Sequence, residues 1–188
     1  MLKNVKFLQC AAAILLVVCV LMGIHIVKDR SLMYKEREHY VSTFSAQTEG
    51  VLEWIQTALE SDDSKEISAS LANAQNYLES LTDTAYAGTY YSICYNTLLT
   101  EKTFFSGAGM FYHDLMVMSG RFTEILENLS ENNALSEEDT EYLEYAEEAF
   151  SYLFERLETD GIINKQAIKS DTYLSNACGY FCYMMLNK

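Results

Sequence analysis

Apolar residues recur at alternating steps of four and three residues in the middle of the chain. This stripe consists of Phe104, Ala108, Phe111, Leu115, Met118, Phe122, Ile125 and Leu129. An average spacing of about 3.5 residues is typical of a helix that packs lengthwise against other helices. Gly107 and Gly109 disfavour the start of this helix, so we expect its regular part to begin near Met110.

A second stripe follows the polar residues 130–133. It consists of Leu143, Ala146, Phe150, Leu153 and Leu157. Ser136 and Asp139 resemble a capping box at the start of this helix, and Gly161 stands where a left-handed residue commonly ends one. We expect the two helices to form an antiparallel hairpin, because only a short polar connection separates them.

Three more segments have helical spacing. A helix opened by Asp63 and Glu66 carries Ile67, Leu71, Ala74, Leu78 and Leu81; a stem before it carries Tyr40, Phe44, Val51, Ile55 and Leu59; and the C-terminal tail carries Leu174, Cys178, Phe181 and Met185. The aromatic segment 84–99 fits either a short helix or a packed loop. The chain contains no proline, which fits long helices.

The N-terminal part has no polar face at all. The residues from Phe7 to Val27 carry no formal charge, and Lys3 and Lys6 precede them. At about 1.5 Å per residue, such a helix spans about 31 Å, enough to cross the hydrocarbon core of a bilayer. A cleaved secretory signal needs small residues at the end of the run, and a lipoprotein needs one before its cysteine. Bulky or polar residues stand at both places, so we predict an uncleaved anchor.

These patterns predict an all-α protein with an N-terminal transmembrane helix followed by an antiparallel helical bundle of about four helices. The expected parts are a short basic tail (1–6), a transmembrane signal-anchor helix (7–27), a helical stem (28–62) and the bundle (63–188), with which the stem packs. Signal-anchors usually leave a short basic tail in the cytoplasm. We therefore expect a single-pass protein of the cell membrane whose C-terminal domain is extracytoplasmic.

The chain is strongly acidic, with a formal net charge of −14. Thirteen acids lie between Glu124 and Asp160, where Arg156 is the only lysine or arginine. Such a surface repels nucleic acids and anionic lipid headgroups, so we expect no nucleic-acid partner. The acids either keep a solvated helix face soluble or form a docking site for a basic protein.

Tyrosine is unusually frequent, with fourteen residues. A tyrosine ring offers an apolar face and a hydroxyl group, which suits a wide core, a protein contact or the stacking of a sugar. The candidate partner-binding residues are the clustered tyrosines and the acids on the helix that carries the second stripe: Tyr86, Tyr90, Tyr91, Tyr95, Glu137, Glu138, Glu141, Glu144 and Glu148.

Catalytic and metal-binding motifs are missing from the sequence. Glu36 and His39 form a single Glu-x-x-His pair, whereas a two-metal bundle needs two such pairs and further carboxylates. No G-x-S-x-G or phosphate-loop motif is present. Cys94 has apolar neighbours, which favours a buried and inert thiol, and Cys178 and Cys182 are too close on one helix for a routine disulfide. We predict no enzyme, no cofactor and no metal.

Three stretches resemble the N-terminal region of the spore germination protein YpeB family. They are Ser68–Ala72 (SASLA), Phe105–Phe111 (FSGAGMF) and Leu135–Asp139 (LSEED). The resemblance covers roughly residues 1–160 and includes the membrane segment. It implies a helical partner-binding module of a spore-forming Gram-positive bacterium, without the PepSY-type C-terminal domains that the family also carries.

These observations favour a membrane-anchored helical bundle that acts as a protein–protein interaction or assembly module at the membrane surface. One alternative is an extracytoplasmic ligand-sensing bundle. Because bundles of that kind normally have a second span and a cytoplasmic output domain, it would need a separate signalling partner. The other alternative is a cell-wall carbohydrate-binding module that uses the tyrosines between Tyr86 and Tyr95.

Overall fold

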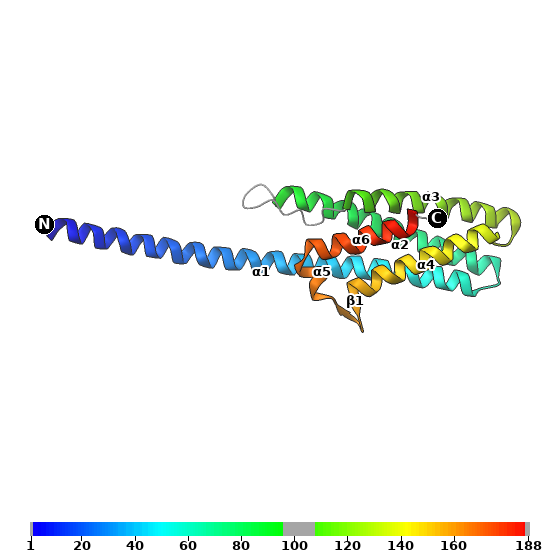
Figure 1. Ribbon diagram of the computed structural model, residues 1–188, viewed down its shortest axis with the longest axis horizontal. Helices are drawn as coiled ribbons and strands as arrows, with labels where there is room; N and C mark the ends of the chain where they lie inside the picture. Colours follow the sequence, from blue (N-terminus) through cyan, green and yellow to red (C-terminus); the bar gives the residue numbers. More distant parts are fainter. Residues whose placement is uncertain (1, 96–107, 187–188) are drawn as a thin grey trace. The chain divides into compact units, whose positions relative to one another are not determined.

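The computed structural model describes the backbone at residues 2–95 and 108–186, and side chains at residues 14–28, 31–88, 110–170 and 172–186. Helices make up nearly all of it (Figure 1), so the predicted all-α class is confirmed. The elements are α1 (Leu2–Glu60), α2 (Ser64–Tyr95), α3 (Ala108–Asn132), α4 (Glu137–Leu157), β1 (Glu158–Thr159), β2 (Ile162–Ile163), α5 (Lys165–Lys169) and α6 (Asp171–Leu186).

The chain divides into two compact units, Met1–Arg37 and Glu38–Lys188, and α1 contributes residues to both. The first unit is helical throughout its described residues. Within the described part of the chain, we find no helix with a stretch both long enough and apolar enough to cross a bilayer. The first seven residues of the predicted span, 7–13, lie outside the described side chains.

The predicted apolar stripes form the core of the second unit. In α2, α3 and α4 every described stripe residue is buried, from Ile67 to Leu81, from Phe111 to Leu129 and from Leu143 to Leu157. α3 begins two residues before the predicted start. Phe104 and Ala108 lie outside the described side chains. The helical period therefore located the buried face of each of these helices correctly.

The predicted stem and tail also join this core. Phe44, Val51 and Ile55 of α1 are buried, as are Cys178 and Phe181 of α6. α5 and the hairpin of β1 and β2 add to these long helices, so the described bundle has more elements than the predicted four helices. The ambiguous segment 84–99 is helical as far as the end of α2, and its last four residues lie outside the described chain.

A cluster of four phenylalanines connects four helices inside the second unit. The ring centroid of Phe111 lies 5.6 Å from that of Phe44 and 5.2 Å from that of Phe181. Phe181 in turn lies 4.9 Å from Phe150. α6 therefore packs against both α3 and α4, as its position in Figure 1 indicates.

Gly161 is left-handed, as predicted, but the prediction that it caps the end of a helix is wrong. α4 ends four residues earlier, at Leu157, and β1 pairs with β2 in an antiparallel hairpin. Asp160 (φ 53°) and Gly161 (φ 75°) form the turn between them. Two positive φ values in a two-residue loop are what a type I′ turn requires, and Asp-Gly is a preferred sequence for it. Gly161 is left-handed because of the hairpin.

Gly88 allows α2 to approach α1 closely. A Cβ atom at Gly88 would collide with the Tyr40 hydroxyl and would lie 2.8 Å from Cζ of the same ring. That hydroxyl donates a hydrogen bond of 3.2 Å to the carbonyl oxygen of Thr84. Burial raises the pKa of Tyr40, and the nearby Cys178 adds to the shift, so the hydroxyl keeps its proton.

We expect Gly88→Ala to lower the free energy of unfolding by about 1 kcal/mol, because the clash with Tyr40 outweighs the gain in helix propensity. Gly120→Ala is the matched control, since nothing lies within 4 Å of the added Cβ on α3. This control should raise the free energy of unfolding by about 0.5–1 kcal/mol. Urea unfolding followed by circular dichroism measures both, and equal stabilisation by the two variants would contradict the close contact.

Candidate functional site

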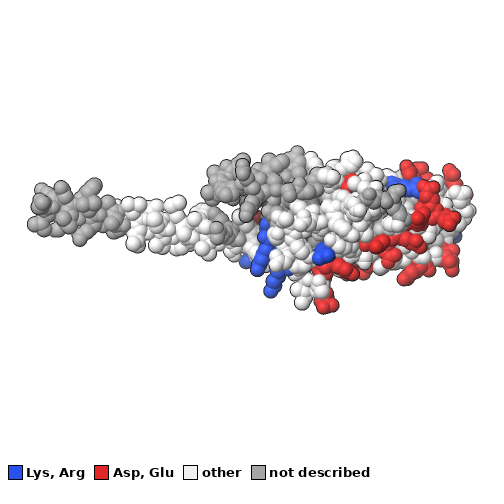
Figure 2. All heavy atoms as spheres, viewed as in Figure 1, with Lys and Arg blue, Asp and Glu red and all other residues white. Residues whose placement is uncertain are grey.

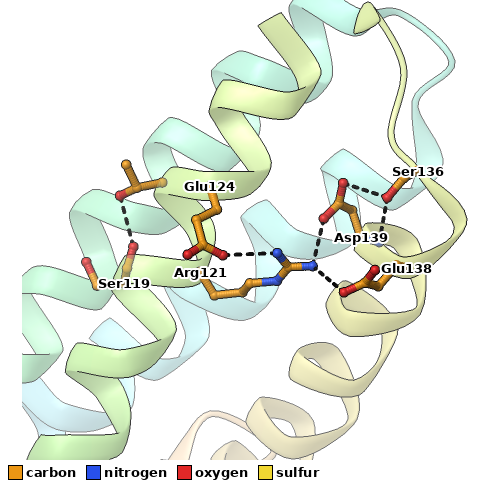
Figure 3. A network of polar contacts seen from close by, with 7 residues as sticks. Ser119, Arg121, Glu124, Ser136, Glu138 and Asp139 are labelled. Atoms are coloured by element: carbon orange, nitrogen blue, oxygen red, sulfur yellow. Dashed lines mark hydrogen bonds and ion pairs between the residues drawn. The ribbon is translucent and has the colours of Figure 1, made fainter. Parts of the chain in front are cut away.

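Arg121, on α3, contacts the start of α4 through acidic side chains (Figure 3). Its Nη1 atom lies 3.0 Å from Oε2 of Glu124, one turn later on α3. Its Nη2 atom lies 3.2 Å from Oε1 of Glu138 and 3.0 Å from Oδ1 of Asp139, both in the first turn of α4. A guanidinium group is a planar fork of N–H donors, so it serves acceptors on two helices at once.

Asp139 is the buried member of this network, with 1% of its surface exposed. Its Oδ2 atom accepts a hydrogen bond of 2.7 Å from the Ser136 hydroxyl, and the same hydroxyl oxygen accepts one of 3.0 Å from the Asp139 N–H. Ser136 is therefore the N-cap of α4, as predicted. A buried carboxylate needs hydrogen bonds and an opposite charge, and Asp139 has both.

An open groove of about 450 Å³ lies beside this network, where the C-terminal end of α6 meets α3 and α4. We call it the Arg121 groove. It is lined by Arg121 from α3, by Glu138, Glu141, Tyr142 and Tyr145 from α4, and by Met184 and Met185 from α6. Its apolar part is continuous with the core, because Tyr142 and both methionines pack against buried residues.

Two titratable groups of the groove, Tyr142 and Arg121, have raised pKa values. Burial raises the pKa of Tyr142 to about 12, against the opposing charge of Arg121 and with a contribution from Glu124. Burial lowers the pKa of Arg121, but its hydrogen bond to Glu124 and the charges of the neighbouring carboxylates outweigh burial. The pKa of Arg121 is therefore raised above its ordinary value. The guanidinium also lies over the Tyr142 ring, 5.7 Å from its centroid. Both groups keep their protons near neutral pH.

All five predicted acids of α4 are exposed: Glu137, Glu138, Glu141, Glu144 and Glu148. Glu138 and Glu141 line the Arg121 groove, whereas the other three lie outside its lining. Arg121 itself was not among the predicted site residues. The available signal was its isolation, since no other lysine or arginine occurs between residues 103 and 155.

Of the four predicted tyrosines, the structure describes the side chain of Tyr86. It is 46% exposed, and its ring centroid lies 5.2 Å from that of Tyr112 on α3. Tyr90, Tyr91 and Tyr95 lie outside the described side chains. Whether these four tyrosines act together stays a prediction.

A second cluster of tyrosines joins α4 to α6, and the sequence pattern did not predict it. The ring centroid of Tyr180 lies 4.5 Å from that of Tyr152 and 6.0 Å from that of Tyr183. The guanidinium of Arg156 lies 5.1 Å from the centroid of Tyr152, on the same helix. This cluster lines no part of the Arg121 groove.

No family model, no curated protein and no solved structure matches this chain. Two of the stretches that resemble the YpeB family lie at helix starts, SASLA in the early turns of α2 and LSEED at the opening of α4. Most of the third, Phe105–Phe111, lies outside the described side chains. The resemblance stays a prediction.

Proposed function

We propose that this chain is a membrane-anchored helical bundle that docks a basic partner protein at the membrane surface and catalyses no reaction. The observation that carries the proposal is the acidic surface of α4. Figure 2 shows acidic atoms gathered over α4 and over the end of the bundle where α3 joins it. With a net charge of −14, the chain attracts basic proteins and repels acidic ones.

The anchor part of the proposal comes from the uncharged run Phe7–Val27 and the lysines before it. A single span with a short basic tail holds the second unit near the membrane, on the extracytoplasmic side. Tethering supports docking, because it confines the bundle and a membrane-bound partner to the same surface and so raises their effective concentration.

A photo-crosslinking amino acid placed at Glu144 or Glu148 tests the docking role in cells. We expect both positions to crosslink the same protein of basic surface, since both side chains are exposed on the acidic helix. Glu79, an exposed acid on α2, is the matched control and should give no such product. Membranes are washed with alkaline carbonate before analysis, and the chain should remain with them.

Two results would contradict the proposal in different ways. Recovery of the intact chain from the carbonate supernatant would contradict the proposed membrane anchor. Crosslinking of the same proteins from Glu79 as from the α4 positions, or of none from any position, would remove the docking role of α4.

A further inference from the structure

The Arg121 groove combines an apolar surface, the ion-paired Arg121 and two acidic side chains in one small space. We infer that it binds an amphipathic helix of the partner protein, one that presents a lysine or arginine beside a bulky apolar residue. This inference rests on the proposed docking function and assigns it a place and a partner chemistry. The side chains that line the groove, their charge and the volume of the groove support this inference.

The apolar part of the groove lies where α6 meets α4. α6 packs against both α3 and α4. The groove lies at the C-terminal end of α6, where Met184 and Met185 meet the tyrosines of α4.

Methionine and tyrosine suit this surface to a helix. Unbranched methionine side chains adapt to differently shaped apolar groups, and helix-binding grooves commonly use them. Tyrosine provides a large apolar area at low cost in conformational entropy, because its side chain has only two rotatable angles. A leucine or phenylalanine side chain of a partner helix therefore has an apolar surface to contact.

The two glutamates that line the groove, Glu138 and Glu141, favour a partner of positive charge. Oε1 of Glu138 accepts a hydrogen bond from Arg121, yet the Glu138 side chain is 85% exposed, and Glu141 on the same helix is exposed too. A lysine or arginine one turn from the apolar anchor would form charge-assisted hydrogen bonds with these carboxylates. An acidic helix, or a second copy of this chain, would meet like charge instead.

The volume of the Arg121 groove limits how much of a partner helix it can hold. The groove holds about 450 Å³ and is open to solvent, which gives room for side chains of a partner but does not enclose a helix. The partner helix would therefore lie against the groove and place the side chains of one or two of its turns in it.

The experiment titrates the full-length chain, in a zwitterionic detergent, with a helical probe peptide of about 15 residues. The probe carries two lysines and a leucine on one face; one variant replaces the leucine with serine and another replaces the lysines with glutamate. Fluorescence anisotropy measures affinity. The 13C-methyl signals of Met184 and Met185, assigned with Met→Leu variants, report where the probe binds, and both should shift.

We expect Glu138→Gln combined with Glu141→Gln to weaken probe binding by about tenfold. The matched pair Glu127→Gln with Glu131→Gln removes the same charge from exposed positions on α3 outside the groove, and should weaken binding less than about twofold. The serine and glutamate probes should each bind at least about tenfold more weakly than the parent.

Equal weakening by the two glutamine pairs, or undiminished binding of the serine probe, would overturn the groove inference and leave a basic partner docked by diffuse charge. A small polyamine that shifts the same methyl signals as strongly as the probe would overturn the helix assignment. So would a shift with protein concentration alone, which would identify a second copy as the occupant. Probe binding in the groove, without any crosslinked partner in cells, would count against the proposed function alone.

Discussion

Replacement of Phe181 by alanine is expected to lower the free energy of unfolding of the bundle by about 3–5 kcal/mol. The side chain is 0% exposed and contacts both Phe111 and Phe150, with ring centroids 5.2 and 4.9 Å away. Phe111 extends the cluster to Phe44, so one truncation opens a cavity among four helices. Urea unfolding of the full-length chain in detergent, followed by far-ultraviolet circular dichroism, measures the loss.

Two further variants on α6 separate this packing effect from a general sensitivity of the helix. Phe181→Leu keeps most of the volume and should cost no more than about 1.5 kcal/mol. Tyr183→Ala removes a ring that is 60% exposed and should cost no more than about 1 kcal/mol. If Tyr183→Ala costs as much as Phe181→Ala, the phenylalanine cluster is not the centre of the core.

The buried faces were predictable because the period of the apolar residues alone determines which side of a helix is buried. Phe111, Phe122 and Phe150 each lie on a predicted stripe, and each is 0% exposed. The hairpin of β1 and β2 was missed although its signal is local. Gly161 was assigned to a helix cap because a positive φ serves both structures, and Asp160 before it was the residue that favours a turn.

The Arg121 groove could not be predicted from the period of the apolar residues. Its lining comes from three helices, and residues 121, 142 and 185 are far apart along the chain. The apolar period does not determine how far one helix is rotated or shifted against another. The acidic half of the groove was anticipated through Glu138 and Glu141, because a run of acids is visible without tertiary structure.

Replacement of Arg121 by alanine is expected to lower the free energy of unfolding by about 2–3 kcal/mol, because the buried carboxylate of Asp139 would lose its cation. Glu124→Gln is the comparison within the same network. Its side chain is 64% exposed, so the loss should not exceed about 1 kcal/mol. Unfolding in urea at a fixed, moderate salt concentration measures both, since exposed pairs are screened more strongly than buried ones.

A double-mutant cycle shows whether this loss comes from Asp139. Asp139→Asn keeps a side chain of similar shape next to Ser136 and carries no charge, so it needs no cation. In that background Arg121→Ala should cost about 1–2 kcal/mol less than in the original chain. In the original chain, Arg121→Lys should lower the free energy of unfolding by less than Arg121→Ala does. It should still cost stability, because an ammonium group cannot reproduce the fork that reaches Glu124 and α4 together. If Arg121→Ala costs the same with either residue at position 139, the ion pair between Arg121 and Asp139 does not hold α3 to the start of α4.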